Sequence, residues 1–265
     1  MHLTRKNSSP KKKRNLSIDY IYKRNTILKL DILALAAHPD DVELCCGATI
    51  AKHIALGYKV GVVDFTRGEL GTRGTPEIRV QEAEKASEIM GLSVRENLGF
   101  RDGFFEKDEI HLKKVIGMIR KYRPDTILIN AENDRHPDHG RAHELSKEAC
   151  FLSGLHKIET LADGLKQEAW RPKNVYSYIQ GWFMTPDFVV DVTDHWEIKM
   201  NAIRAFRSQF HDPNSQEPAT WLSSEGFIKL IEGRGIEMGQ AIGCSYGEGF
   251  KVLRWPGVND ITKLL

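Results

Sequence analysis

Two short clusters of histidine and aspartate carry residue types that bind divalent metals and transfer protons. The first cluster reads AHPDD over residues 37–41, and the second reads RHPDH over residues 135–139. A hydrolytic zinc ion is usually held by three nitrogen or carboxylate ligands and keeps a fourth position open for water. The two clusters together therefore predict a hydrolytic metal site.

Each side chain of the clusters has a predicted role in such a site. Asp40 would stay uncoordinated, accept a proton from water as general base, and return it to a leaving amine as general acid. His136 would stabilise an oxyanion, with Asp138 accepting a hydrogen bond from its ring. The predicted metal ligands are two histidines and one aspartate, namely His38, Asp41 and His139.

Either cluster alone has a simpler explanation. His-Pro-Asp can form an ordinary turn in which proline sets φ and aspartate caps a helix. Here both clusters follow a strand-like run and precede a helix-like segment. This shared context favours one metal site over two unrelated turns.

The elements that must position these clusters alternate between strand and helix patterns. The apolar run 30–37 ends at the first residue of the first cluster, and the run 126–130 ends shortly before the second cluster. Alternation of this kind predicts an α/β fold with a mostly parallel sheet flanked by helices. Because ligands bind beyond the carboxyl ends of parallel strands, both clusters should meet at one edge of the sheet.

The remaining segments complete the predicted pattern. Thr75 and Pro76 have the residue types of an N-cap and a first helical position. Further strands are expected over residues 59–65, 175–180 and 188–192. Helices are expected over residues 48–56, 76–90, 111–122, 139–152, 196–206 and 227–239.

Composition predicts a single domain behind a basic extension. The chain has 265 residues, of which 41% are apolar, enough for one large core. Its first 30 residues hold nine Lys or Arg and one acid, whereas the rest holds 29 basic and 35 acidic residues. We therefore expect a disordered extension over 1–28 and a domain over 29–265. The acidic body argues against nucleic-acid binding.

Further features predict a cytoplasmic protein without a membrane segment. No apolar run approaches the roughly 20 residues that cross a bilayer. The four cysteines show no Cys-x-x-Cys spacing, which fits a reducing compartment. A glycine-rich loop over 66–76 carries arginines that could clamp an anionic or polyhydroxyl substrate, although solvated charge is the more common role.

The motifs resemble those of the LmbE-like (PIG-L) metal-dependent N-acetylglucosamine deacetylases. The resemblance extends from about Leu30 to the C-terminus and is closer to the branch that deacetylates N-acetylglucosaminyl malate in bacillithiol biosynthesis. The segments that carry it are AHPDD (37–41), TRGELGTRG (66–74), DGFF (102–105), DRHPDHG (134–140) and SQF (208–210).

The resemblance implies the same metal, general-base and oxyanion roles as the residue chemistry. It also implies that Arg79 contacts substrate, and it extends this role less directly to Arg67, Arg73 and Arg135. The resemblance also implies a Rossmann-like fold and a Zn²⁺ site that could accept Fe²⁺ instead. It further implies a homo-oligomer, either a trimer or a hexamer. Relatives of this branch begin near residue 28, so the preceding residues are a departure from the pattern.

The function expected from the sequence is zinc-dependent amide hydrolysis. Metal-activated water, with Asp40 as general base, would release acetate from the small-molecule substrate N-acetylglucosaminyl malate. Alternatives are another N-acetylglucosamine-containing substrate, including mycothiol-type or chitobiose-type compounds, and a catalytically silent carbohydrate- or metal-binding protein. A module that binds anions through the basic extension is a further alternative.

Overall fold

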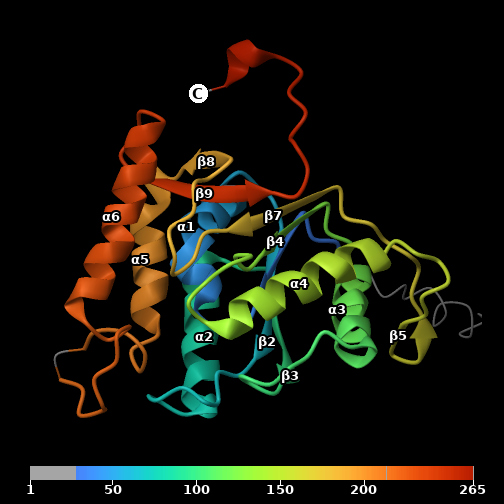
Figure 1. The fold of residues 1–265 in the computed structure, drawn as a ribbon, viewed down its shortest axis with the longest axis horizontal. Helices are drawn as coiled ribbons and strands as arrows, with labels where there is room; N and C mark the ends of the chain where they lie inside the picture. Colours follow the sequence, from blue (N-terminus) through green and yellow to red (C-terminus); the bar gives the residue numbers. More distant parts are fainter. Residues whose placement is uncertain (1–27, 213, 265) are drawn as a thin grey trace, which may run out of the picture.

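One mostly parallel sheet passes through the protein. The computed structural model describes residues 28–212 and 214–264. The sheet has the order β3-β2-β1-β4-β7-β9-β8, in which β9 runs antiparallel to both neighbours and the other pairs are parallel (Figure 1). Its strands are β1 (Ile32–Ala36), β2 (Val60–Thr66), β3 (Val94–Phe100), β4 (Thr126–Ile129), β7 (Asn174–Tyr178), β8 (Phe188–Asp191) and β9 (Gly247–Val252). The predicted α/β fold is confirmed.

Helices cover both faces of the sheet because the central strands are apolar on both sides. In β1, Leu33 and Leu35 pack into the core beneath α3 and α4, whereas Ile32 and Ala34 pack with α1. Helices α2, α5 and α6 form a further apolar cluster outside α1. The helices are α1 (Asp41–Ala55), α2 (Pro76–Met90), α3 (Glu109–Tyr122), α4 (Pro137–Leu152), α5 (Trp196–Ala205) and α6 (Glu225–Ala241).

The strand order creates a switch point between β1 and β4. From β1 the chain continues to β2 and β3 on one side, and from β4 it continues to β7 on the other. Loops that leave neighbouring strands in opposite directions open a crevice at their carboxyl ends. Residues 37–41 and 135–139 follow these two strands, so the topology brings the two clusters to one crevice.

The first helix begins earlier than its sequence pattern predicts. Expected near Ala48, α1 starts at Asp41, with Asp41 and Glu43 in its first turn. The backbone leaves helical geometry at Cys46, with φ −143° and ψ 18°. The apolar pattern therefore located only the part beyond this kink.

Two sheet strands and a hairpin were missed. Strand β3 contains Arg95, Glu96 and Asn97 and has exposed positions, so it lacks the apolar run of a buried strand. Strand β9 contains Gly247 and Gly249, which weaken a strand pattern. The hairpin of β5 (Leu161–Ala162) and β6 (Leu165–Lys166) has only two residues in each strand.

The predicted basic extension lies outside the described residues except for Leu28. After β9 the chain leaves the body of the molecule and ends with the short helix η2 (Ile261–Lys263), at the top of Figure 1. Across the described ranges, no helix has the length and apolarity needed to cross a bilayer. The four cysteines are free.

A buried ion-pair network fixes α1 against the sheet and predicts a large loss of stability when broken. Arg95 on β3 contacts the carboxylates of Asp64 and Glu43, whose side chains are 2% and 0% exposed. Arg95→Met would leave both carboxylates buried without their cation, which should cost about 3–5 kcal/mol of unfolding free energy. Urea denaturation measures this loss.

Lys85→Met is the matched control, because Lys85 pairs with Glu88 on the surface. An exposed pair contributes about 0–1 kcal/mol. Equal unfolding midpoints for the two variants would contradict a structural role for the Arg95 network.

Candidate active site

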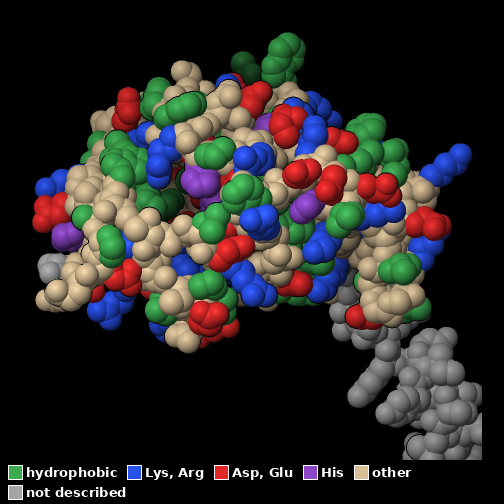
Figure 2. Space-filling model, turned by 60° about the horizontal axis from the view of Figure 1, so that its bottom comes forward, with side chains coloured by type: hydrophobic (Ala, Val, Ile, Leu, Met, Phe, Trp, Pro, Cys, Tyr) green, Lys and Arg blue, Asp and Glu red, His purple; other side chains and the backbone are tan. Residues whose placement is uncertain are grey.

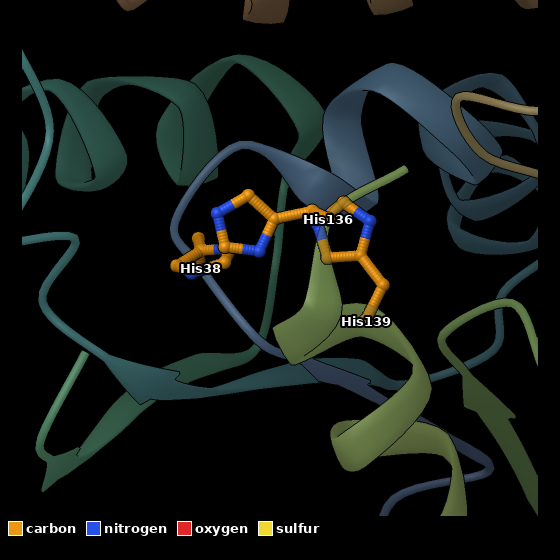
Figure 3. A group of neighbouring side chains, drawn as sticks. All are labelled: His38, His136 and His139. Carbon is orange, nitrogen blue, oxygen red and sulfur yellow. The ribbon is translucent and has the colours of Figure 1, made fainter. Parts of the chain in front are cut away.

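Three histidines of the two clusters meet at the carboxyl edge of the sheet. His38 comes from the turn between β1 and α1, and His136 and His139 lie at the start of α4 (Figure 3). One nitrogen from each ring lies within 4.8 Å of the other two. The sheet topology therefore brings the two histidines predicted as metal ligands, His38 and His139, together with His136, which the sequence assigns to the oxyanion.

Asp41 is held in this group from four directions. Its carboxylate accepts hydrogen bonds from the His38 backbone N–H (3.0 Å), Asn130 Nδ2 (3.0 Å) and Gln180 Nε2 (3.2 Å). His139 Nε2 lies 3.1 Å from its Oδ1. Burial alone would raise the pKa of Asp41, but the charge and hydrogen bond of His139 hold it well below its usual range. This carboxylate is therefore ionised, as a metal ligand must be.

Asn130 and Gln180 are site residues that sequence reasoning missed. Asn130 follows β4 and Gln180 lies just beyond β7, and they bond to each other at 3.0 Å. Both are almost fully buried. Neither belongs to a histidine-aspartate cluster, and only the pairing of β1, β4 and β7 brings them to Asp41.

Asp134 orients His139 from the side opposite Asp41. Its Oδ2 contacts His139 Nδ1, and its Oδ1 accepts the Trp182 backbone N–H at 2.7 Å. A carboxylate on the second ring nitrogen fixes the tautomer and increases the basicity of a ligating histidine. The position of Asp134, five residues before His139, was the available sequence signal.

Replacing Asp134 tests this orienting role. Asp134→Asn keeps the side-chain shape but removes the charge, and should weaken Zn²⁺ affinity about 10–100-fold. Competition with a chromophoric chelator measures the affinity. Wild-type Zn²⁺ affinity in the variant would show that the contact is dispensable.

His38 lies between two further carboxylates. Its Nε2 is 3.0 Å from Asp102 Oδ1 and 3.4 Å from Asp138 Oδ2. This arrangement differs from the expectation that Asp138 accepts from the His136 ring. The Asp138 carboxylate instead accepts the Gly103 N–H at 2.7 Å and pairs with Arg141, because α4 turns it toward the loop after β3.

The backbone determines the tautomer of His136. The Asp138 N–H donates to His136 Nδ1 at 3.2 Å, so a neutral ring carries its proton on Nε2. Burial, together with the charges of His38 and His139, lowers the pKa of His136 to about 4. His136 is thus a neutral hydrogen-bond donor at the wall of the cleft.

Asp40 is a buried carboxylate in a strained backbone position. Its φ of 111° lies in the left-handed region, which non-glycine residues rarely adopt and which often marks functional sites. Arg79 Nη2 lies 3.1 Å from its Oδ2 and also donates to the Pro39 carbonyl. Burial raises the pKa of Asp40 to about 7, although the charge of Arg79 opposes this shift. A carboxyl of this kind exchanges protons near neutral pH.

The donor chemistry of the site fits a divalent cation. Burial alone would lower the pKa of His38 and of His139, but nearby carboxylates raise these values to about 10 and about 9. The field at the histidines is therefore strongly negative and favours added positive charge. The carboxylates responsible lie in helices and loops at this edge of the sheet and include Asp41, Asp102, Asp134 and Asp138.

The site opens into a cleft of about 530 Å³. Figure 2 shows a hollow on this face with histidine side chains at its edge. Arg73, Arg79 and Arg135 line the cleft, as a substrate-binding role requires, and Arg135 stacks 4.4 Å from the centre of the Trp221 ring. Arg67 is exposed and lies outside the cleft lining, whereas the next residue, Gly68, lines the cleft.

The fold and site define a doubly wound α/β protein with a histidine-carboxylate centre at its switch point. The PIG-L family, described as GlcNAc-PI de-N-acetylase, matches residues 33–150. The conserved protein TT1542 from Thermus thermophilus has a similar structure, with a TM-score of 0.78, 33% identity, and coverage of 87% of this chain and 97% of that chain.

Two curated relatives extend the comparison. Diacetylchitobiose deacetylase of Thermococcus kodakarensis is 28% identical over 239 residues, 86% of this chain and 84% of that protein. The 4-oxalmesaconate hydratase of Pseudomonas putida is 26% identical over 242 residues, 83% of this chain and 87% of that protein. The chain belongs to the PIG-L family of LmbE-like deacetylases, which confirms the enzyme class that the sequence predicted.

Proposed function

We propose that the chain removes the N-acetyl group from N-acetylglucosaminyl malate. The observation that carries this proposal is the position of Asp40, a buried carboxylate beside a histidine-aspartate donor set in a cleft lined by arginines. His38, Asp41 and His139 would hold the metal. A bound Zn²⁺ would polarise the amide carbonyl and lower the pKa of water.

Asp40 transfers the proton and His136 stabilises the oxyanion in the proposed reaction. Asp40 accepts a proton as water attacks the acetyl carbonyl and returns it to the glucosamine nitrogen as the C–N bond breaks. His136 donates from Nε2 to the developing oxyanion, since its Nδ1 already accepts the Asp138 N–H. The products are acetate and a free amine.

The arginines that line the cleft favour a substrate whose aglycone is anionic, such as malate. Arg73 lies 5% exposed in the wall, where its Nη2 donates to Ser215 Oγ at 2.6 Å. The planar guanidinium group of Arg135, stacked on Trp221, remains able to bind a carboxylate in its own plane. The predicted contact between Arg79 and substrate would add to its contact with Asp40.

The proposal is tested by measuring acetate release from N-acetylglucosaminyl malate and from free N-acetylglucosamine. Metal-stripped protein is compared with and without added Zn²⁺ or Fe²⁺. Metal-dependent turnover that strongly favours the malate conjugate is expected. Equal, slow turnover of both compounds would support deacetylase activity but reject the malate conjugate as the preferred substrate. Inactivity with every divalent metal would favour the alternative of a catalytically silent binding protein.

Two proposals concern the whole chain. We propose a homo-oligomer, trimer or hexamer, which sedimentation equilibrium tests directly. We also propose that residues 1–27 are dispensable for catalysis, because all the proposed metal ligands and catalytic side chains belong to the described part of the chain. Their removal should leave kcat/KM unchanged, whereas loss of anion binding on removal would support the anion-binding alternative.

A further inference from the structure

A second cavity adjoins the active-site cleft. It has a volume of about 80 Å³ and lies among α1, α5, α6 and β9, which stand next to one another in Figure 1. The residues that line both this cavity and the cleft are Asp41, Leu44, Arg135, His139, Trp221 and Leu222. The cavity therefore begins at the predicted metal ligands and extends away from the arginines of the loop before α2.

Beyond this shared wall, the lining is mainly apolar. Trp196 comes from α5, and Phe227, Ile231 and Met238 come from α6. These four side chains belong to residues that are less than 9% exposed. Replacement of water by a hydrocarbon group at such an apolar surface is favourable in free energy.

The charged side chains deep in the cavity already have protein partners. Lys199 Nζ lies 2.6 Å from Glu248 Oε1, with both side chains almost fully buried. Arg234 donates to the backbone carbonyls of Gln180 and Gly181. A ligand in this cavity therefore meets apolar surface rather than a free charge.

We propose that this cavity, called here the acyl cavity, receives the hydrocarbon chain of the acyl group. The proposal rests on the amide hydrolysis proposed above and extends its substrates to glucosamine amides with acyl groups of about four to six carbons. Water adds to the amide carbonyl, the C–N bond breaks, the amine takes the proton, and the carboxylate leaves with its chain from the cavity.

The size of the acyl cavity supports this assignment. One water molecule needs only about 10–15 Å³ of such space, so the cavity exceeds the needs of a single small group. Each additional buried methylene should raise kcat/KM about fourfold. The increase ends when the chain outgrows the cavity, so a dodecanoyl amide should react poorly.

The experiment uses the full chain loaded with Zn²⁺ and four substrates that differ only in the acyl group. Acetyl, butanoyl, hexanoyl and dodecanoyl amides of the same glucosaminyl compound are compared by release of the free amine. A butanoyl-to-acetyl ratio of kcat/KM of about ten or more supports the acyl cavity. Hydrolysis of the acetyl amide with equal or slower reaction of the longer amides overturns it, whereas inactivity toward all four rejects the proposed hydrolysis itself.

Two substitutions of Ile231 test whether the acyl cavity causes the preference among acyl chain lengths. Ile231→Phe fills it and should lower the butanoyl-to-acetyl ratio, whereas Ile231→Ala enlarges it and should shift the preference toward hexanoyl. Ile236→Ala is the matched control, because Ile236 lies on the same helix, is 42% exposed and is not among the residues that line the cavity. Unchanged ratios in both folded Ile231 variants would overturn the proposal.

Discussion

Asp40→Asn should lower kcat by about 10²–10⁴-fold while the protein still binds metal. Asparagine has nearly the same shape and can keep a contact with Arg79, which lies 3.1 Å from the Asp40 carboxylate. It cannot accept the proton of water. The variant therefore separates proton transfer from assembly of the site, and single-turnover kinetics with a parallel metal analysis measure both.

The control is Asp163→Asn, because Asp163 is exposed in the turn between β5 and β6 and has a φ of 50°, which asparagine tolerates. Its kcat should equal that of the wild type. A near-normal kcat in Asp40→Asn would show that another group acts as the base.

His139→Ala should abolish stoichiometric metal binding and with it the metal-dependent activity. His139 Nε2 faces the Asp41 carboxylate at 3.1 Å, and its other nitrogen contacts Asp134. Loss of an orienting partner alone lowers metal affinity about 10–100-fold. Loss of the ligand itself should therefore lower metal affinity by more than about 100-fold. Elemental analysis of protein dialysed against trace Zn²⁺ measures the retained metal.

His156→Ala is the matched control, since His156 is exposed and lies outside the cleft lining. It should retain the wild-type metal content. Stoichiometric zinc in His139→Ala would remove His139 from the ligand set and favour a site built on His38 with Asp102 and Asp138, whose donor atoms also lie within 4.8 Å of one another.

Most helices and buried strands could be predicted from sequence because their signals are local. Helix α2 begins at Pro76 after Thr75, whose side chain accepts the Ile78 N–H, and it ends before Gly91 at a φ of 79°. Strand β3 escaped prediction because Arg95 is directed into a buried ion-pair network. A charged residue inside a strand is favourable only when its partners, here Asp64 and Glu43, arrive from other elements.

The residues that face the crevice in the turns after β1 and β4 could be identified from the chain alone. The first cluster directly follows β1, and the second follows β4 after the five residues 130–134, so the chain direction alone places both at the carboxyl edge of the sheet. The chemistry of histidine and aspartate then indicated the metal and proton-transfer roles.

How these groups are held depends on the tertiary fold. Three side chains reach the site from the ends of other strands, namely Asn130 after β4, Gln180 after β7 and Asp102 after β3. The strand order brings these strand ends close to β1, because β4 is next to β1 and β7 and β3 each lie one strand further away. Arg79 reaches Asp40 from α2, 39 positions away in sequence. Such contacts leave no local pattern, because they depend on strand order and helix packing rather than on spacing along the chain.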